Sequence, residues 1–278
     1  MPSLPITVVI LTHNEEKNIE PCLASVASFP DVHVLDSGST DATAERARQC
    51  GATVHTHPFV SFGSQRNWAI DHIPARFPWT LHLDADERMT PELAAEMAAV
   101  VATGPPLGGY NVSSKLMFAG RWLKHAGDYP VYQVRLFHKD RLRFVDYGHG
   151  QRESSTYPLG RLQQPYLHFA FSKGLDSWFA KHAVYAAQEA MQATREIAYT
   201  SPPRVGGLSR GDRTARRRLL KRLAYHLPCR YLFRLAYMLF IKRAFLDGRA
   251  GVTYALLLAT YEGMIEVHQR LLRDGIAP

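Results

Sequence analysis

The chain has 278 residues, of which 46% are hydrophobic and 21% charged, so it is long enough for one large α/β domain and a smaller appendage. Its cysteines, Cys22, Cys50 and Cys229, show no Cys-x-x-Cys spacing, which excludes a disulfide framework or a zinc site and fits a reducing cytosol. The formal net charge of +8 favours acidic partners such as phosphorylated small molecules, anionic lipid or nucleic acid. No basic segment precedes the apolar run 6–11, which we interpret as a buried strand and not as a signal peptide.

Short apolar runs alternate with helix-like segments in the first part of the chain. The expected strands span 6–11, 32–35, 53–56 and 79–83, and the expected helices span 16–27, 42–49, 64–73 and 91–102. Such alternation predicts a Rossmann-like, mostly parallel sheet with helices on both faces. Open sheets of this type bind ligands beyond the carboxyl ends of their strands.

The pattern becomes strand-rich after residue 106 and helical towards the end. Strands are expected at 110–115, 132–138, 142–145 and 162–169, and helices at 175–197, 231–245 and 252–272. Charged residues interrupt the last two helices, so neither is expected to span a bilayer. A linker rich in Pro, Gly and Arg at 201–213 separates an expected domain over 1–200 from a basic, helical appendage over 201–278.

An apolar, strand-like segment ends in two carboxylates, Asp84 and Asp86. Residues i and i+2 of an extended chain point to one side, so both side chains can face a common ligand. Oxygen ligands suit Mg²⁺ or Mn²⁺, and such a cation can neutralise a diphosphate leaving group. Because Asp-x-Asp is common, a solvated strand-to-helix turn is the alternative interpretation.

A second group of polar residues, 36–41, follows the strand expected at 32–35. Asp36 can accept a hydrogen bond from the imide of uracil or from ribose hydroxyls. It can equally satisfy only the backbone donors of a capped turn, because Asp, Ser and Thr are favoured in turns for that reason.

Taken together, four segments resemble inverting glycosyltransferases of family 2 with the GT-A fold. These segments are 8–16, 35–43, 65–69 and 83–87, in this order and spacing. Segments 120–123 and 129–137 resemble the branch that includes lipopolysaccharide-core β-glucosyltransferases. The likeness covers about residues 6–190 and implies a GT-A catalytic domain over 1–200, with a nucleotide-binding half at 1–105 and an acceptor half at 106–200.

This resemblance implies roles for residues at the strand ends. Three residues, Thr12, Asn14 and Glu15, are expected to line the nucleotide pocket, and Asp36 to contact uracil or ribose. Arg66 is expected to approach the base or the diphosphate, with a surface salt bridge as the alternative.

The metal assignment also follows from the resemblance, whereas the two interpretations of Arg135 follow from its alternation with apolar neighbours. Asp86 is expected to bind Mn²⁺ or Mg²⁺ directly, with Asp84 nearer the ribose and the metal-bound waters. Arg135 either points into the cleft, where a guanidinium suits a diphosphate, or lies on the exposed face of its strand. The scattered histidines, His168 among them, lack the i, i+4 spacing of a metal site and are interpreted as structural.

An inverting transfer needs a general base near the acceptor hydroxyl. The chain departs from its relatives here, because Val131 replaces an acid after the Tyr-Pro pair and Gly150 replaces the acid of a downstream His-Glu pair. The remaining candidates, in order of preference, are Asp128, Glu153 and Asp146, and each could equally be a solvated loop acid.

The tail suggests a location. Eight Arg or Lys residues lie between Arg204 and Arg222, ahead of apolar helices. This suits the cytoplasmic face of an anionic membrane, where a lipid-linked acceptor would be found, or a helical hairpin packed on the catalytic domain or in a homodimer.

The sequence therefore predicts a metal-dependent enzyme that moves a hexose from a nucleotide-diphosphate donor, with UDP-glucose expected, to a glycan or glycolipid of the cell envelope, such as lipopolysaccharide. Transfer to polyprenyl phosphate is the alternative. A nucleic-acid-binding protein is disfavoured, because no RRM, zinc-finger or helix-turn-helix signature accompanies the charge.

Overall fold

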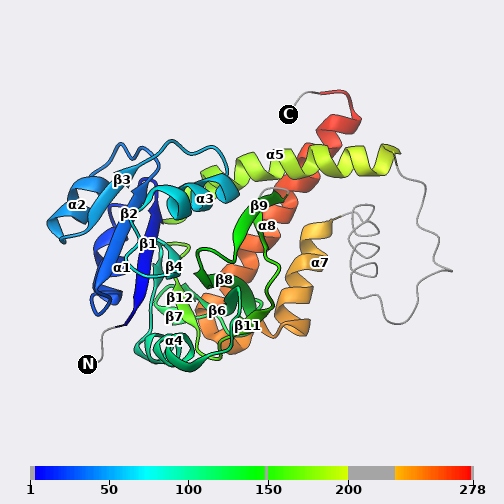
Figure 1. Cartoon of the computed structure of the whole chain (residues 1–278). Helices are drawn as coiled ribbons and strands as arrows, with labels where there is room; N and C mark the ends of the chain where they lie inside the picture. The colour runs from blue at the N-terminus through cyan, green and yellow to red at the C-terminus, as the bar shows by residue number, and fades with distance from the viewer. Residues whose placement is uncertain (1–3, 148–149, 200–228, 277–278) are drawn as a thin grey trace. The chain divides into compact units, whose positions relative to one another are not determined.

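The computed structural model describes residues 4–147, 150–199 and 229–276, which Figure 1 colours along the chain. The chain forms two compact units, Met1–Lys173 and Gly174–Pro278. The predicted linker at 201–213 and the basic segment that contains it lie outside the described residues. The predicted domain boundary at residue 200 stays a prediction.

The first half of unit 1 follows the predicted alternation of strands and helices. Its elements are β1 (Ile6–Thr12), α1 (Ile19–Ser25), β2 (Asp31–Asp36), α2 (Thr43–Gln49), β3 (Thr53–Thr56), α3 (Phe62–His72), β4 (Trp79–Asp84), β5 (Glu87–Arg88) and α4 (Pro91–Thr103). Helix α4 begins where the sequence indicates, because the Thr90 side chain accepts a hydrogen bond from the Leu93 N–H and Pro91 needs no partner for its nitrogen.

The second half of unit 1 is strand-rich. It contains β6 (Gly109–Phe118), β7 (Arg121–Trp122), β8 (Val131–His138), β9 (Arg143–Tyr147), β10 (Gly150–Ser154), β11 (Leu159–Arg161) and β12 (Tyr166–His168). The prediction of one strand over 162–169 is wrong. The N–H groups of Gln163 and Gln164 donate to the Glu96 carboxylate, and Pro165 has no N–H, so the pairing with β6 is interrupted between β11 and β12.

The main sheet has the strand order β3-β2-β1-β4-β8-β6-β12-β5, with β7 and β11 also pairing with β6. Strands β3, β2, β1 and β4 run parallel, β8 is antiparallel to β4 and β6, and β9 and β10 form a separate pair. The register sets Thr12 opposite Asp36 and Leu11 opposite Asp84. Three strand ends with polar side chains therefore lie at one edge of the sheet.

Alternating residues of β1 are buried under different helices. Val8 and Ile10 belong to a core cluster that includes residues of α1 and α4, whereas Val9 packs with Ala69 and Ile73 at the end of α3. Since successive strand side chains point to opposite faces, helices cover both faces of the sheet. The predicted α/β class is confirmed.

Unit 2 is helical. It contains α5 (Leu175–Tyr199), α7 (Arg230–Ala236), the π-helical turn η2 (Tyr237–Ile241), the 3₁₀ turn η3 (Ala244–Asp247) and α8 (Gly248–Arg273). Helices α5 and α8 pack through Ala186, Ala190 and Ile265. In the described part of the chain, no helix has the length and apolar character needed to cross a bilayer.

The prediction of a single helix over 231–245 is wrong. The helix ends because the Lys242 N–H donates to the Tyr237 carbonyl five residues earlier, which widens the last turn. Arg243 then takes a left-handed conformation with φ of 57°, which no continuous helix allows.

Candidate active site

Thr12 and Asp36, at the ends of β1 and β2, are both buried, with 5% and 3% of their surface exposed. The Thr12 hydroxyl has no hydrogen-bond partner in the structure. A buried polar group without a partner costs free energy, so this hydroxyl is suited to a ligand that would complete it.

Asp36 holds the turn that follows it. Its carboxylate accepts hydrogen bonds from the N–H groups of Gly38 and Ser39, at 3.2 and 2.9 Å, and from the Ser39 hydroxyl. This is the geometry of a capped turn. The carboxylate keeps acceptor capacity, because its two oxygens offer about four lone-pair sites.

Asn14 and Glu15 connect the loop after β1 to the loop after β2. Asn14, with φ of 53°, donates its N–H to the Ser39 hydroxyl and accepts from the Thr40 N–H, both at 2.8 Å. The Glu15 N–H donates to the Thr43 hydroxyl at 2.7 Å, and the Glu15 carboxylate is 2.6 Å from the Lys173 ammonium. Both predicted nucleotide-pocket residues therefore have partners within the protein that fix the loops around the strand ends.

Helix α3 is fixed to the same edge by Gln65. Its amide donates to the Ser37 hydroxyl at 3.0 Å and to the His57 carbonyl at 3.1 Å, and its carbonyl oxygen lies 2.8 Å from His57 Nδ1. Sequence reasoning did not single out Gln65. Its place beside Arg66 in the motif segment 65–69 was the available signal.

Arg66, Arg135, Asp84 and Glu87 form an ionic cluster in which the side chains other than that of Asp84 are buried. The Arg66 guanidinium donates to Asp84 at 2.9 Å, and that of Arg135 donates to Asp84 at 2.8 Å and to Glu87. Glu87 also accepts the Asp84 N–H at 3.1 Å, and the Arg135 guanidinium lies over the Tyr166 ring. The cluster orients the Asp84 carboxylate, whose side chain stays 40% exposed.

The cluster shifts the pKa values of its acids in opposite directions. Burial opposes ionisation of Asp84, but Arg135 and Arg66 outweigh it and hold the pKa of this carboxyl well below its usual range. Burial raises the pKa of Glu87, and the Asp84 charge adds to this rise while Arg135 opposes it. Asp84 is thus a fixed anion facing solvent.

The two arginines differ in how many of their N–H groups remain available to a ligand. Arg66 is 3% exposed, so the surface-salt-bridge alternative does not describe it, and its Nε and Nη1 groups have no partner. Arg135 is 2% exposed and paired with two carboxylates, so it lies neither on an exposed strand face nor free in a cleft. Arg66 keeps donors for an anionic or carbonyl ligand, and Arg135 chiefly positions Asp84.

Asp86 faces a different partner. Strand β4 ends at Asp84, so the extended geometry that predicted a common face for both aspartates does not reach Asp86. Instead, β12 pairs antiparallel with β5 and sets His168 opposite Glu87. His168 Nε2 lies 3.3 Å from Asp86 Oδ2, so the structure brings a histidine to the acidic pair that sequence reasoning had left as structural.

Asp86 and His168 supply two of the ligands that a divalent cation would need. Burial of the His168 imidazole opposes protonation, but the hydrogen bond to Asp86 and the surrounding carboxylates raise its pKa. The Asp86 carboxylate, in the turn between β4 and β5, suits Mn²⁺ or Mg²⁺. The His168 imidazole on β12 would bind a cation only in its neutral form, and water or phosphate would supply the further ligands. Among the described residues, no cluster of three or more His, Cys, Asp or Glu side chains is arranged to bind a metal.

A cavity of about 390 Å³ in unit 1 lies between Arg66 and Asp84 on one side and the strand-rich second half of the unit on the other. It is also lined by β8, by Phe144, and by the β10 residues Gln151 and Glu153. Of the three predicted base candidates, Glu153 lines this cavity.

The other two base candidates lie elsewhere. The Asp146 carboxylate accepts from the Ser61 hydroxyl at 2.7 Å and the Gly63 N–H at 2.9 Å, and so holds the start of α3. Asp128 lies in the loop between β7 and β8 with φ of 57°. Neither residue lines the cavity.

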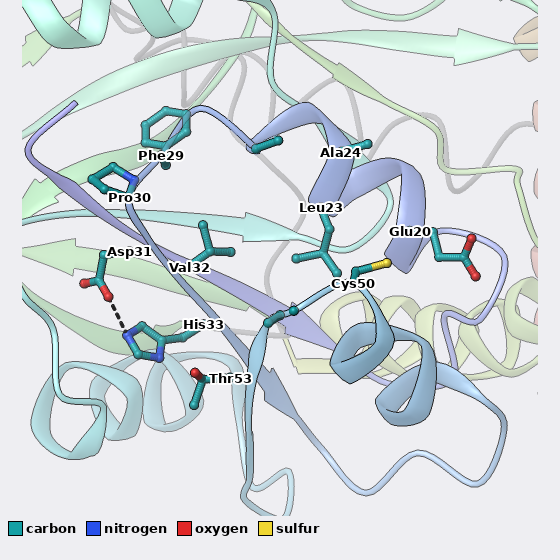
Figure 2. Close-up of a pocket in the computed structure, with 13 residues that line it drawn as sticks. Glu20, Leu23, Ala24, Phe29, Pro30, Asp31, Val32, His33, Cys50 and Thr53 are labelled. Atoms are coloured by element: carbon teal, nitrogen blue, oxygen red, sulfur yellow. Dashed lines mark hydrogen bonds and ion pairs between the residues drawn. The ribbon is translucent and has the colours of Figure 1, made fainter. Parts of the chain in front are cut away.

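A second hollow, of about 630 Å³, lies at the opposite ends of the strands, between α1, β2 and the start of β3 (Figure 2). Asp31 and His33, which line it, bond to each other with 3.1 Å between Oδ1 and Nε2. It includes none of the predicted site residues.

Comparison with known proteins assigns the family. The model of glycosyl transferase family 2 matches residues 7–157, more than half of the chain, and the chain belongs to this family. This confirms the resemblance seen in the sequence, and the fold is of the GT-A class.

Individual relatives are distant. A lipopolysaccharide core biosynthesis glycosyltransferase, LpsC of Rhizobium meliloti, is 26% identical over 125 residues, which are 43% of this chain and 46% of that protein. An uncharacterized glycosyltransferase of Rickettsia bellii is 35% identical over 99 residues, which are 35% of this chain and 33% of that protein. The chain thus spans less than half the length of these relatives.

Among solved structures, glucosyl-3-phosphoglycerate synthase of Mycobacterium tuberculosis, in complex with Mn²⁺ and UDP-glucose, is 25% identical with a TM-score of 0.34, covering 40% of this chain and 43% of that one. Another complex of that synthase has a TM-score of 0.38 at 22% identity, covering 49% of this chain and 56% of that one.

Proposed function

We propose that this chain is a metal-dependent inverting glycosyltransferase that moves a hexose from a nucleotide-diphosphate donor, with UDP-glucose as the expected donor, to a glycan or lipid-linked acceptor. The observation that carries the proposal is the concentration, at one edge of the sheet, of buried polar groups without a partner beside a carboxylate and imidazole pair. These are the orphaned Thr12 hydroxyl, the free donors of Arg66 and the paired side chains of Asp86 and His168.

The donor nucleotide would occupy the ends of β1, β2 and β4. Thr12 and Asp36 would contact the uracil or the ribose, where a buried hydroxyl and a buried carboxylate can satisfy imide and hydroxyl groups. Arg66 would donate its unused N–H groups to the base or the diphosphate. Asn14 and Glu15 would act by holding the two loops around this pocket.

Asp86 and His168 would hold the divalent cation, Mn²⁺ or Mg²⁺. When bound, such an ion neutralises the charge that develops on the departing diphosphate. Asp84, oriented by Arg66 and Arg135, would stay ionised beside the ribose and the metal-bound waters.

Glu153 would be the general base. It lines the same cavity as Arg66 and Asp84, so an acceptor in this cavity would have its hydroxyl near both the donor edge and a carboxylate. Asp128, which the sequence favoured, is the alternative to be tested beside it. Asp146 would hold α3.

The acceptor proposal rests on the distant relative named for lipopolysaccharide core biosynthesis. An acceptor of that kind is an envelope glycan or glycolipid, and the enzyme would work at the cytoplasmic face of the membrane.

A screen of nucleotide sugars for metal-dependent hydrolysis and transfer tests the proposal. Wild type is compared with Asp86→Ala and with Asp140→Asn, whose side chain is 70% exposed and remote from the predicted site residues. Loss of turnover in Asp86→Ala, with activity kept in Asp140→Asn, is the expected result. Unchanged turnover in Asp86→Ala, or no donor turned over by wild type, would reject it.

A further inference from the structure

We propose that residues 240–246, which we call the 240–246 turn, dock this chain onto an anionic lipid surface. The turn connects α7 to α8 within unit 2 and contains the end of η2 and most of η3. The inference goes beyond the proposed reaction, because it assigns the partner to a particular surface that no part of the glycosyl transfer uses.

The turn exposes large apolar side chains to an unusual degree. Phe240 and Ile241 are 72% and 71% exposed, and Phe245 and Leu246 are 52% and 51% exposed. The preceding turns of α7 and η2 add exposed side chains at Leu232, Phe233 and Tyr237. A contiguous exposed apolar segment of this kind marks an interaction surface.

Cations are interleaved with these apolar residues. Lys242 and Arg243 lie between the two apolar pairs, and Arg249 follows at the start of α8. The acid of this segment, Asp247, is only 4% exposed. Arg243 and Arg249 are exposed and Lys242 is half-buried, so the charges that the segment presents to solvent are positive and complement anionic lipid head groups.

The turn is held rigidly from behind, so its side chains are presented in one arrangement. Met238 and Ala244 are buried, and a Cβ on Gly251 would lie 2.0 Å from the Ala244 carbonyl oxygen. Arg243, with φ of 57°, reverses the chain, and the Leu246 N–H donates back to the Arg243 carbonyl at 2.9 Å. Binding would thus cost little ordering of the backbone.

Charge also argues against a second copy as the occupant. A two-fold interface brings the same surface of both copies together. Here it would place the exposed Arg243 of one copy near that of the other, while Asp247 is buried in both. A bilayer offers an apolar interior for Phe240 and Ile241 and phosphates for the cations at the same time.

Co-sedimentation with vesicles tests the proposal, without donor or acceptor, so that its failure is separate from failure of the proposed reaction. Wild type is expected to bind vesicles that contain phosphatidylglycerol far better than vesicles of phosphatidylcholine alone, and added salt should weaken the binding. Replacing two cations in Lys242→Gln/Arg243→Asn should weaken it about 30-fold, and Phe240→Ser/Ile241→Ser at least about tenfold. Asn is chosen at position 243 because it tolerates the left-handed conformation.

Val184→Ser on α5 is the matched control, because Val184 is 57% exposed but lies outside the turn. It should bind like wild type, and circular dichroism should show that all variants are folded. Phe240→Trp gives a second readout that does not depend on weakened binding. Brominated lipid should quench the fluorescence of the tryptophan introduced at position 240. Equal binding by all variants, no quenching, or a dimer that both double variants convert to a monomer would overturn the proposal.

Discussion

Asp86 and His168 face each other across the junction of β5 and β12, with 3.3 Å between a carboxylate oxygen and an imidazole nitrogen. The pairing depends on a two-residue strand, Glu87–Arg88, that sets His168 opposite Glu87. This contact turns an acidic turn into a mixed carboxylate and imidazole site. It also gives the proposed metal site a residue from the far end of unit 1.

If these two residues share a cation, removing either should lower its affinity. Asp86→Asn and His168→Gln are each expected to weaken UDP binding in Mn²⁺ by about 10- to 100-fold, because loss of a ligand or its support has effects of that size. The double variant should be little worse than the singles, since the sites are coupled. Titration calorimetry with Mn²⁺ and with a chelator measures this.

The chelator supplies the internal control: without metal, all three variants should bind UDP as weakly as wild type does. Asp140→Asn should behave as wild type in both conditions. Additive effects of Asp86→Asn and His168→Gln, or equal losses with and without metal, would show that the two side chains do not share an ion.

Sequence alone could place Asp84 but not His168. The end of a buried strand is visible in the apolar run that precedes Asp84, and register follows from the parallel βα pattern. His168 reaches Asp86 through an antiparallel pairing of two very short strands, which leaves no periodic signal. Arg135 was ambiguous for another reason: β8 is buried on both faces from Val134 to Phe137, so alternation does not report a face.

The same contrast holds for the fold. Strands and helices up to α4 were predictable because each carries its own period and turn residues. The break at η2 was not predictable, because residues 231–245 have the pattern of one apolar helix. Neither the widened turn at Lys242 nor the left-handed conformation of Arg243 leaves a signal in that pattern. The predicted strand over 162–169 is wrong for a similar reason. The Glu96 carboxylate on α4 accepts the N–H groups of Gln163 and Gln164, which a strand would have used for pairing.

Glu153 and Asp128 make opposite predictions for the general base. Glu153→Gln is expected to lower kcat for transfer about 100- to 10,000-fold while the Kd of UDP is unchanged, because a base acts only on the acceptor proton. Asp128→Asn should keep most activity. Steady-state transfer kinetics beside UDP titration separate the two effects.

The reverse pattern would return the role to Asp128, as the sequence preferred. If both variants stay active and polyprenyl phosphate is the acceptor used, no strong base is needed, because that acceptor is already anionic.

Asp146 is expected to matter for stability and not for chemistry. Asp146→Ala removes the acceptor for the Ser61 hydroxyl and the Gly63 N–H at the start of α3, and should lower the free energy of unfolding by about 1 kcal/mol. Gly63→Ala should be destabilising too, because its Cβ would lie 2.8 Å from the Asp146 carboxylate. Urea unfolding measures both, and a large fall in kcat with unchanged stability in Asp146→Ala would contradict this role.

The Glu87 and Arg135 pair predicts a large loss and a partial rescue. Both side chains are nearly fully buried, so Glu87→Leu should lower the free energy of unfolding by about 3–5 kcal/mol by leaving Arg135 with a single carboxylate partner. Glu87→Leu/Arg135→Met should recover part of this stability but not donor turnover, since Asp84 loses its orientation. Urea unfolding with turnover assays tests both parts.

The exposed pair Asp71 and Arg143, with side chains 51% and 46% exposed, is the control. Asp71→Asn should change stability by less than about 1 kcal/mol. A double variant that is no more stable than Glu87→Leu would indicate that packing, and not the unpaired charge, sets the loss.

Asp31 predicts a pH dependence of stability at the other end of the sheet. Burial opposes its ionisation, but hydrogen bonds from the Thr7 hydroxyl and the Arg76 N–H, together with His33, lower the pKa of Asp31 in the folded protein. A lowered folded pKa means that the native state binds a proton less readily than the unfolded chain. The stabilisation is therefore complete above the unfolded pKa of about 3.9 and is lost as the pH falls from there through the folded pKa.

Asp31→Asn should remove this part of the acid dependence while leaving the rest. Its stability, followed by urea unfolding from neutral pH downwards, should fall less steeply below about pH 4 than that of wild type. Asp140→Asn, an exposed acid, should keep the wild-type slope. Parallel curves of unfolding free energy against pH for wild type and Asp31→Asn would contradict this prediction. They would mean that Thr7 and Arg76 bind a neutral side chain as well as the carboxylate, so that the network linking β1 to the segment before β4 does not depend on charge.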